Sequence, residues 1–435
     1  MTPTSSTAAA WWQPDAPPAV SARPARGRAA FGALAVYTVI LVAAPQEFVP
    51  ALAPLRLAFS AAAVAIVAAL ADRWAGRART RPWPRELTLV AALLAWAVVT
   101  VPFSYWPGGS VGVLLGLYLK SVAVFALLAT VVDSEARLRQ LVGVLVACAA
   151  IIAVTALNHY REGVLMAGAR DRIAGYGTSG MAGNPNDLAL LLNIVIPFEA
   201  ALMLTTRRPL VKAAASIVLL ASVGGVIVTF SRGGFIALAI TAALGLWQLV
   251  RRGAVLAAVA MLTASCLAVA FVPDRYAARL ETVTNLDADA TGSAQDRWRD
   301  TVVATTFALH HPLVGAGLGM DYLALNDVRG REWLSVHNTY LNYAVDLGAV
   351  GLTLFLAIFA SAWLGAARVE RRRRASEGPR QRDALRAYAT AARIALTTFA
   401  VAACFHPIAY HAFFYYLAGL AVAIRQIDDL PGAVS

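Results

Sequence analysis

The sequence predicts an all-α polytopic membrane protein with about 12 transmembrane helices and one large, partly helical outer loop. The chain is 59% hydrophobic and only 14% charged, whereas a soluble domain is about half apolar and about a quarter charged. Apolar runs of about 17–23 residues recur from Phe31 to Ile424, and a helix needs this length to cross a bilayer. Because backbone polar groups must be paired inside lipid, these runs are expected to be α-helices.

The chain divides into five predicted parts. Residues 1–28 are rich in Ala, Pro, Ser and Thr and are expected to be a disordered cytoplasmic segment, without the apolar core of a signal peptide. Residues 29–272 hold spans one to nine, 273–338 form the large loop, 339–427 hold the last three spans, and 428–435 form a cytoplasmic tail. The spans are expected to begin near Phe31, Leu52, Leu87, Val111, Leu138, Leu188, Leu210, Phe235, Ala254, Thr339, Arg386 and Ile408.

The arginines between these spans predict the orientation. If the N-terminus is cytoplasmic, the even-numbered connections are cytoplasmic too, and these hold the positive charge; short connections of the other parity, such as 104–110, carry almost none. Both termini are therefore expected in the cytoplasm, and the net charge of +12 reflects topology rather than nucleic-acid binding. The arginines concerned are Arg73, Arg77, Arg79, Arg81, Arg85, Arg137, Arg139, Arg207, Arg208, Arg251, Arg252, Arg368, Arg371 to Arg374, Arg380, Arg382 and Arg386.

Two outward connections, 158–187 and 273–338, are long. The second holds six Arg and nine Asp or Glu, so it is acidic within a basic protein, and its length predicts structure of its own. Ser293, with Asp296 three residues later, is a candidate N-cap for a helix over about 294–309, which Pro312 would end. The chain shows no internal repeat of the kind that many transporters carry.

Arg232 is the first candidate site residue. Only 42 residues separate Arg208 from Arg251, and two spans use nearly all of them, so the turn 230–234 must lie at the outer membrane boundary. The positive-inside bias predicts no arginine there. The two glycines that follow permit a tight turn, and the rigid donor fork of arginine suits phosphate. We favour an anion site; the alternative is an arginine that reaches to the interface for structural reasons.

His337 and Arg297 are the next candidates. His337 precedes the span that begins near Thr339, and Gly348 lies about three helical turns further on, where a small residue would let a neighbouring helix pack closely. A histidine in this position can accept a proton near neutral pH, or it can be structural. Arg297 lies on the predicted loop helix, where the alternative is a solvated helix face.

The sequence predicts no metal site. His406 and His411 flank a short outward turn, but no cysteine or further histidine completes a ligand set there. Gly315, Gly317 and Gly319 have the wrong spacing for a dinucleotide fingerprint and are interpreted as a flexible turn.

Four short segments together resemble the O-antigen ligase and polymerase superfamily of bacterial envelope glycosyltransferases. They are 231–234 (Ser-Arg-Gly-Gly), Arg297 with Trp298 before the turn 312–319, His337 followed after ten residues by Gly348, and 183–186 (Gly-Asn-Pro-Asn). The resemblance covers the chain from about 31 to 425 in topology. The ligase pattern of Arg, three residues, then Leu is replaced here by Arg232 with Ile236, which leaves ligase and polymerase both open.

The resemblance implies a GT-C-like architecture in the bacterial inner membrane, with the large loop and the active site facing the periplasm. It implies a donor glycan on undecaprenyl diphosphate, a lipid A–core sugar hydroxyl as acceptor, and no metal or nucleotide cofactor. Arg232 and Arg297 would hold the donor diphosphate and His337 would take the acceptor proton, giving inversion by direct displacement. Arg172 and Asn184 are further candidates for donor contact. Alternatives are a polysaccharide polymerase, a protein O-oligosaccharyltransferase or, more distantly, a lipid-linked glycan transporter.

Overall fold

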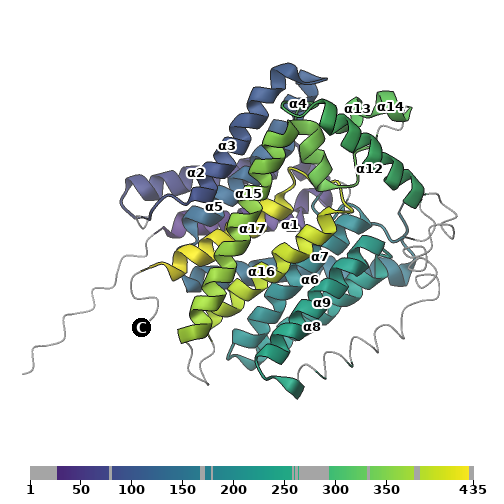
Figure 1. The fold of residues 1–435 in the computed structure, drawn as a ribbon. Coiled ribbons are helices and arrows are strands. Elements are labelled where there is room, and N and C mark those ends of the chain that lie inside the picture. The colour runs from purple at the N-terminus through teal and green to yellow at the C-terminus, as the bar shows by residue number, and fades with distance from the viewer. Residues whose placement is uncertain are drawn as a thin grey trace, which may run out of the picture.

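The computed structural model describes residues 27–77, 81–166, 172–177, 180–256, 259, 263, 293–330, 334–376 and 383–430. These residues form a helical bundle (Figure 1), and the part of the chain described contains no strand beyond a single bridge between Leu165 and Ile173. The helices are α1 (Arg28–Ala43), η1 (Pro45–Glu47), η2 (Pro50–Leu55), α2 (Leu57–Trp74), α3 (Arg85–Thr100), η3 (Val101–Phe103), α4 (Pro107–Val113), η4 (Leu114–Tyr118), α5 (Leu119–Val131), α6 (Glu135–Glu162), α7 (Pro185–Thr205), α8 (Pro209–Val228), α9 (Arg232–Arg251), α12 (Ser293–His310), α13 (Asp321–Ala324), α14 (Asn326–Arg329), α15 (Thr339–Ser376), α16 (Ala384–Ala403) and α17 (Ala412–Asp428).

Eight helices in the described residues are long and apolar enough to cross a membrane, which supports a polytopic membrane protein. Every expected span except the ninth coincides with a helix. Three of these helices are not among the eight: α1, which has only 16 residues, α16 and α17. The ninth span, near Ala254, lies almost entirely outside the described residues, and the predicted disordered segment up to residue 26 and the loop residues 273–292 lie wholly outside them.

Two helices begin later than the sequence predicts. The second span was expected near Leu52, but α2 begins at Leu57, after the 3-10 helix that contains Pro54. The last span was expected near Ile408, but α17 begins at Ala412. In both cases a residue with positive φ, Arg56 (φ 45°) or Tyr410 (φ 67°), lies between the expected and the observed start, and an α-helix cannot continue through that conformation.

Helix α7 lies at the centre of one half of the bundle and packs against α6, α8, α9 and α16 (Figure 1). Its apolar stretch is 78% buried, against 22% for α2 and for α9. A helix that is apolar on all sides is stable only where other helices surround it or lipid does. Helix α7 is therefore enclosed by its neighbours along most of its length, and its first turn is partly buried.

The long loop expected over 273–338 contains the predicted helix. Helix α12 covers Ser293–His310, one residue longer at each end than expected, and packs against α15. Arg329, the last residue of α14, is buried and makes an ion pair of 3.3 Å with Asp300 in α12. The described part of this loop, 293–330 and 334–338, is thus packed against the rest of the molecule.

Gly348 has a different role from the one predicted. It does not lie on a continuous packing face, because α15 kinks there with φ 66° and ψ −168°. The turn 312–319 fills the break: Ala316 N donates to Val345 O at 2.7 Å, and Ala349 N donates to Pro312 O at 2.7 Å. A Cβ on Gly348 would lie 2.1 Å from Leu313 O. The glycine turn is therefore hydrogen-bonded to α15 and fixes the two helical turns that follow His337.

Candidate functional site

A pocket of about 170 Å³ opens where α7 and α9 begin. Its lining combines three arginines with one histidine and, among the described residues, includes no Asp or Glu. The lining residues are Arg172, Asn186, Leu190, Phe230, Ser231, Arg232, Gly233, Gly234, Ala237, Arg297, Ala402, Phe405 and His406. Three arginines predicted from separate parts of the sequence therefore meet at one site, which is suited to an anion.

Two helix N-termini point into this pocket. Asn184 caps α7, and its Oδ1 accepts hydrogen bonds from the backbone N–H groups of Asn186 (2.9 Å) and Asp187 (3.0 Å). Ser231 caps α9, and its Oγ accepts from Gly234 N at 3.2 Å. The first turn of a helix carries partial positive charge and favours an anion. The backbone therefore adds to the positive potential of the arginines.

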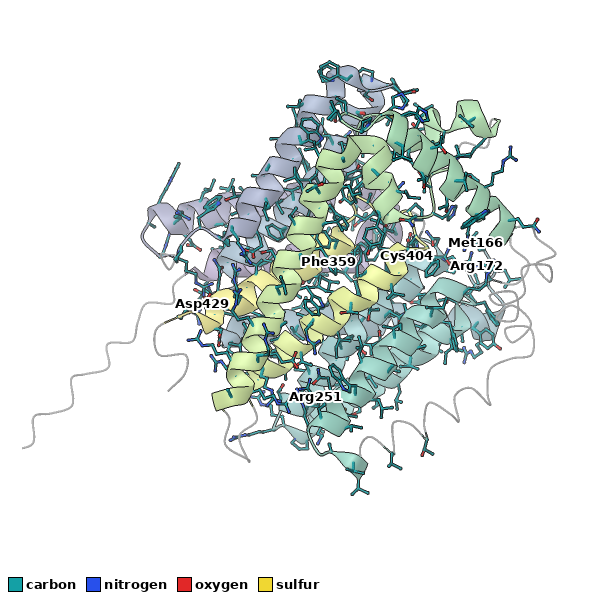
Figure 2. The ribbon with its side chains drawn as sticks, viewed as in Figure 1. Met166, Arg172, Arg251, Phe359, Cys404 and Asp429 are labelled. Carbon is teal, nitrogen blue, oxygen red and sulfur yellow. The ribbon has the colours of Figure 1, made fainter. Side chains whose placement is uncertain are left out.

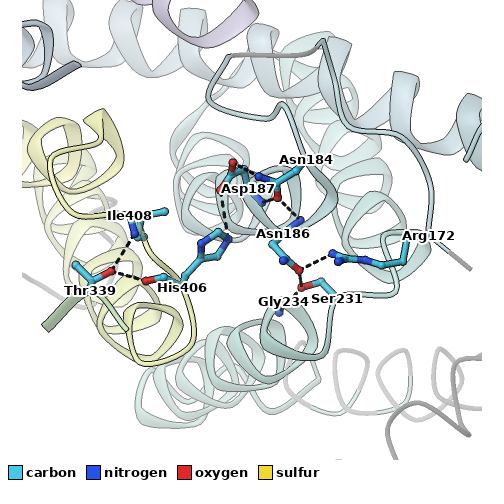
Figure 3. Close-up of polar contacts among 9 residues, drawn as sticks. All are labelled: Arg172, Asn184, Asn186, Asp187, Ser231, Gly234, Thr339, His406 and Ile408. Carbon is cyan, nitrogen blue, oxygen red and sulfur yellow. Dashed lines mark hydrogen bonds and ion pairs between the residues drawn. The ribbon is translucent and has the colours of Figure 1, made fainter. Parts of the chain in front are cut away.

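A polar network joins these two helix starts (Figure 3). Asn186 Oδ1 accepts a hydrogen bond from Arg172 Nη2 at 2.6 Å and another from Ser231 Oγ at 2.8 Å. The network orients Arg172 and links it to the turn that carries Arg232. Asn184 caps the helix and is not among the lining residues, so its contact with a substrate stays a prediction.

Gly234 allows the helices to approach closely. A Cβ on Gly234 would lie 2.6 Å from the Cβ of Ala189, whereas a Cβ on Gly233 would lie 3.6 Å from its nearest neighbour, Phe405 Cβ. Asn193 Nδ2 also donates to Gly234 O at 2.9 Å. Of the two glycines, only the second is required by close packing against α7.

His337 lies in a bend two residues before α15 and is not among the pocket-lining residues. Burial lowers its pKa to about 4, and the nearby positive charges of Arg297 and Arg329 add to this effect. Within the described residues its Nδ1 is buried without a hydrogen-bond partner. His337 is therefore neutral at physiological pH and carries a lone pair that can accept a proton.

His406 is a pocket residue whose role the sequence interpretation missed. Its Nε2 lies 3.3 Å from Asp187 Oδ1 in the first turn of α7 (Figure 3). Burial lowers its pKa to about 3, helped by His411 and His337, so the contact joins a neutral imidazole to the carboxyl group. His406 O also accepts a hydrogen bond of 2.7 Å from Thr339 Oγ1, at the start of α15. The turn between the last two expected spans was visible in the sequence, but its pairing with α7 depends on tertiary structure.

The fold and site define a multi-pass membrane protein with an arginine-lined pocket at one end of its helical bundle. Residues 217–356, about a third of the chain, match the family model described as O-antigen ligase. Over that segment the chain is similar to the family described as O-antigen ligase. The matched segment contains Arg232, Arg297 and His337. A search of curated proteins found no match.

Proposed function

We propose that this protein is an O-antigen ligase that transfers a glycan from undecaprenyl diphosphate to a sugar hydroxyl of lipid A–core. The reaction would take place at the periplasmic face of the inner membrane, without metal or nucleotide. The convergence of Arg172, Arg232 and Arg297 on one pocket at two helix N-termini carries the proposal. A diphosphate is the part of the donor that such a pocket recognises best.

In the proposed mechanism, Arg232 and Arg297 bind the diphosphate and stabilise the negative charge that develops on it. The bond from the anomeric carbon to the phosphate oxygen breaks, and its electron pair leaves with undecaprenyl diphosphate. The acceptor oxygen attacks from the opposite side, so the configuration inverts. His337 takes the hydroxyl proton. Because its pKa is low, it accepts that proton late, once the attacking oxygen has become acidic.

The test is reconstitution of the purified full-length protein with lipid-linked glycan and lipid A–core, in the presence of a chelator and without nucleotide. Ligated lipopolysaccharide is the expected product. If the chelator abolished the reaction, the metal-independent mechanism would be wrong. Extension of the lipid-linked glycan without ligation would instead identify a polymerase, and movement of the donor across the bilayer without bond formation would identify a transporter.

A further inference from the structure

Asp321 is a buried carboxylate in the outer loop that the mechanism above does not use. It begins the short helix α13, its exposed fraction is 2%, and it is not among the residues that line the arginine pocket. Burial raises the pKa of this carboxyl group. Burying a carboxylate is costly unless hydrogen bonds compensate, so the donors around Asp321 indicate what it holds in place.

Those donors come from both sides of His337. Asp321 Oδ2 accepts from the backbone N–H of Val336 at 2.7 Å and from Asn342 Nδ2 at 2.8 Å. Asp321 Oδ1 accepts from Ser335 Oγ at 3.2 Å. Ser335 and Val336 directly precede the histidine, and Asn342 lies in the first turns of α15. The Asp321 carboxylate therefore links the bend that carries His337 to the helix that follows it.

A second set of contacts holds Asp321 in place. The backbone N–H of Asp321 donates to Asp346 Oδ1 at 2.8 Å, and Asp346 Oδ2 accepts from Tyr410 Oη at 3.1 Å. Tyr410 belongs to the turn 404–411 that also carries His406. The chain of contacts thus runs from the His337 bend, through α15, to a turn that lines the pocket.

We propose that Asp321 is a positioning residue for His337, setting the place of the imidazole relative to the pocket. The inference rests on the proposed transferase function. It requires the geometry of the Asp321 side chain and not its negative charge. An asparagine could make the same contacts: its carbonyl oxygen would take the place of Oδ2, and its amide would donate to the Ser335 hydroxyl, which can also accept.

The experiment compares Asp321→Asn and Asp321→Ala with Glu86→Ala in the full-length protein. Glu86 is a matched control, because it is also a buried carboxylate with several donors, but it lies in the first turn of α3, and neither it nor its partner Arg425 lines the arginine pocket. Asp321→Ala should lower kcat about 100-fold, as expected for a misplaced catalytic group, while affinity for undecaprenyl diphosphate stays within about threefold. Asp321→Asn should keep kcat within about threefold of the wild type.

Hydrogen–deuterium exchange supplies a readout that does not need transfer activity. In Asp321→Ala, the backbone N–H of Val336 loses its acceptor, so exchange over 335–338 should become faster; in Asp321→Asn and Glu86→Ala it should stay unchanged. If the wild type showed no transfer, the ligase proposal would fail, and exchange alone would decide whether Asp321 holds this segment.

Three results would overturn the inference. An Asp321→Asn variant as impaired as Asp321→Ala would show that charge, rather than position, matters. Equal losses of kcat in Asp321→Ala and Glu86→Ala would indicate general destabilisation. Unchanged exchange over 335–338 in Asp321→Ala would show that the segment is held by other contacts.

Discussion

The two ends of the bundle both gather arginines, but they surround them differently. At the end away from the pocket, Arg425 makes a bidentate contact with Glu86 (2.7 and 2.8 Å), and Arg393 pairs with Glu370 at 2.7 Å. At the pocket end, the described lining holds three arginines and no Asp or Glu. Figure 2 shows Arg172 and Cys404 on one side of the molecule, with Asp429 and Arg251 away from them.

This difference in the surroundings of the arginines indicates two roles for the arginine side chain. An arginine matched by a buried carboxylate joins helices, since its charge is neutralised within the protein. Arginines gathered around a pocket at helix N-termini raise the positive potential that an incoming anion meets. Variants at the far end should therefore change stability, and variants at the pocket end should change binding or chemistry.

The largest effect is expected for His337→Ala at the pocket end. Loss of a general base should lower the transfer rate about 10²–10⁴-fold, while undecaprenyl diphosphate still binds, because the arginines remain. Single-turnover transfer and donor binding to the same preparation measure the two effects. An equal loss of binding and transfer would make His337 structural.

Glu86→Ala should give the largest effect at the other end. The Arg425 side chain is only 12% exposed, and removing one partner of a buried ion pair costs about 3–5 kcal/mol. The midpoint of thermal unfolding in detergent should fall markedly, with the kcat of the folded protein unchanged. A fall in kcat without a loss of stability would break the distinction between the two ends.

Arg232→Ala should weaken donor binding with little change in stability. A hydrogen bond to a charged group contributes about 1.5–3 kcal/mol, which corresponds to roughly a 10–100-fold change in affinity. Arg232→Lys should also weaken binding, because a lysine keeps the charge but lacks the donor fork. Titration with undecaprenyl diphosphate measures both variants, and wild-type affinity in the lysine variant would show that charge alone suffices.

Gly234→Ala and Gly233→Ala form a matched pair at the pocket. The first places a Cβ 2.6 Å from Ala189 Cβ, and overpacking of this kind costs about 1–3 kcal/mol. The second meets its nearest neighbour at 3.6 Å, an ordinary contact, and should leave the unfolding midpoint almost unchanged. Equal behaviour of the two variants would show that α9 can shift away from α7 without cost.

Mild acid should have the smallest effect. With the pKa of His337 at about 4, about 99% of the imidazole remains unprotonated at pH 6, whereas an unperturbed histidine would fall to about 24%. Transfer should therefore be nearly constant from pH 7 to 6 and decline only as the pH approaches 4. A threefold fall between pH 7 and 6 would mean that the base is not a buried histidine. The pKa of His337 is lower in the folded state than in the unfolded state, so the unfolded chain binds the proton more readily. The stability that neutral His337 contributes is therefore present above about pH 6.5 and is lost as the pH falls toward 4.

The sequence by itself determined the helical class, the outer-loop helix and the candidate arginines. These features are local: an apolar run long enough for a bilayer predicts a span wherever it occurs, and Ser293 with Pro312 marks the bounds of α12. Arg232 stood out because its place between two spans contradicts the charge bias of its neighbours.

Only the tertiary structure decided which residues meet. The turn 312–319 makes backbone hydrogen bonds with α15 on both sides of its kink, so Gly348 marks the kink and is not part of a continuous helical face. His406 joins the pocket because the turn before α17 packs on the start of α7. Asp321 reaches the His337 bend because α13 folds back onto α15. Each of these contacts joins segments that are apart in the sequence, and no local pattern of hydrophobicity or charge encodes such pairings.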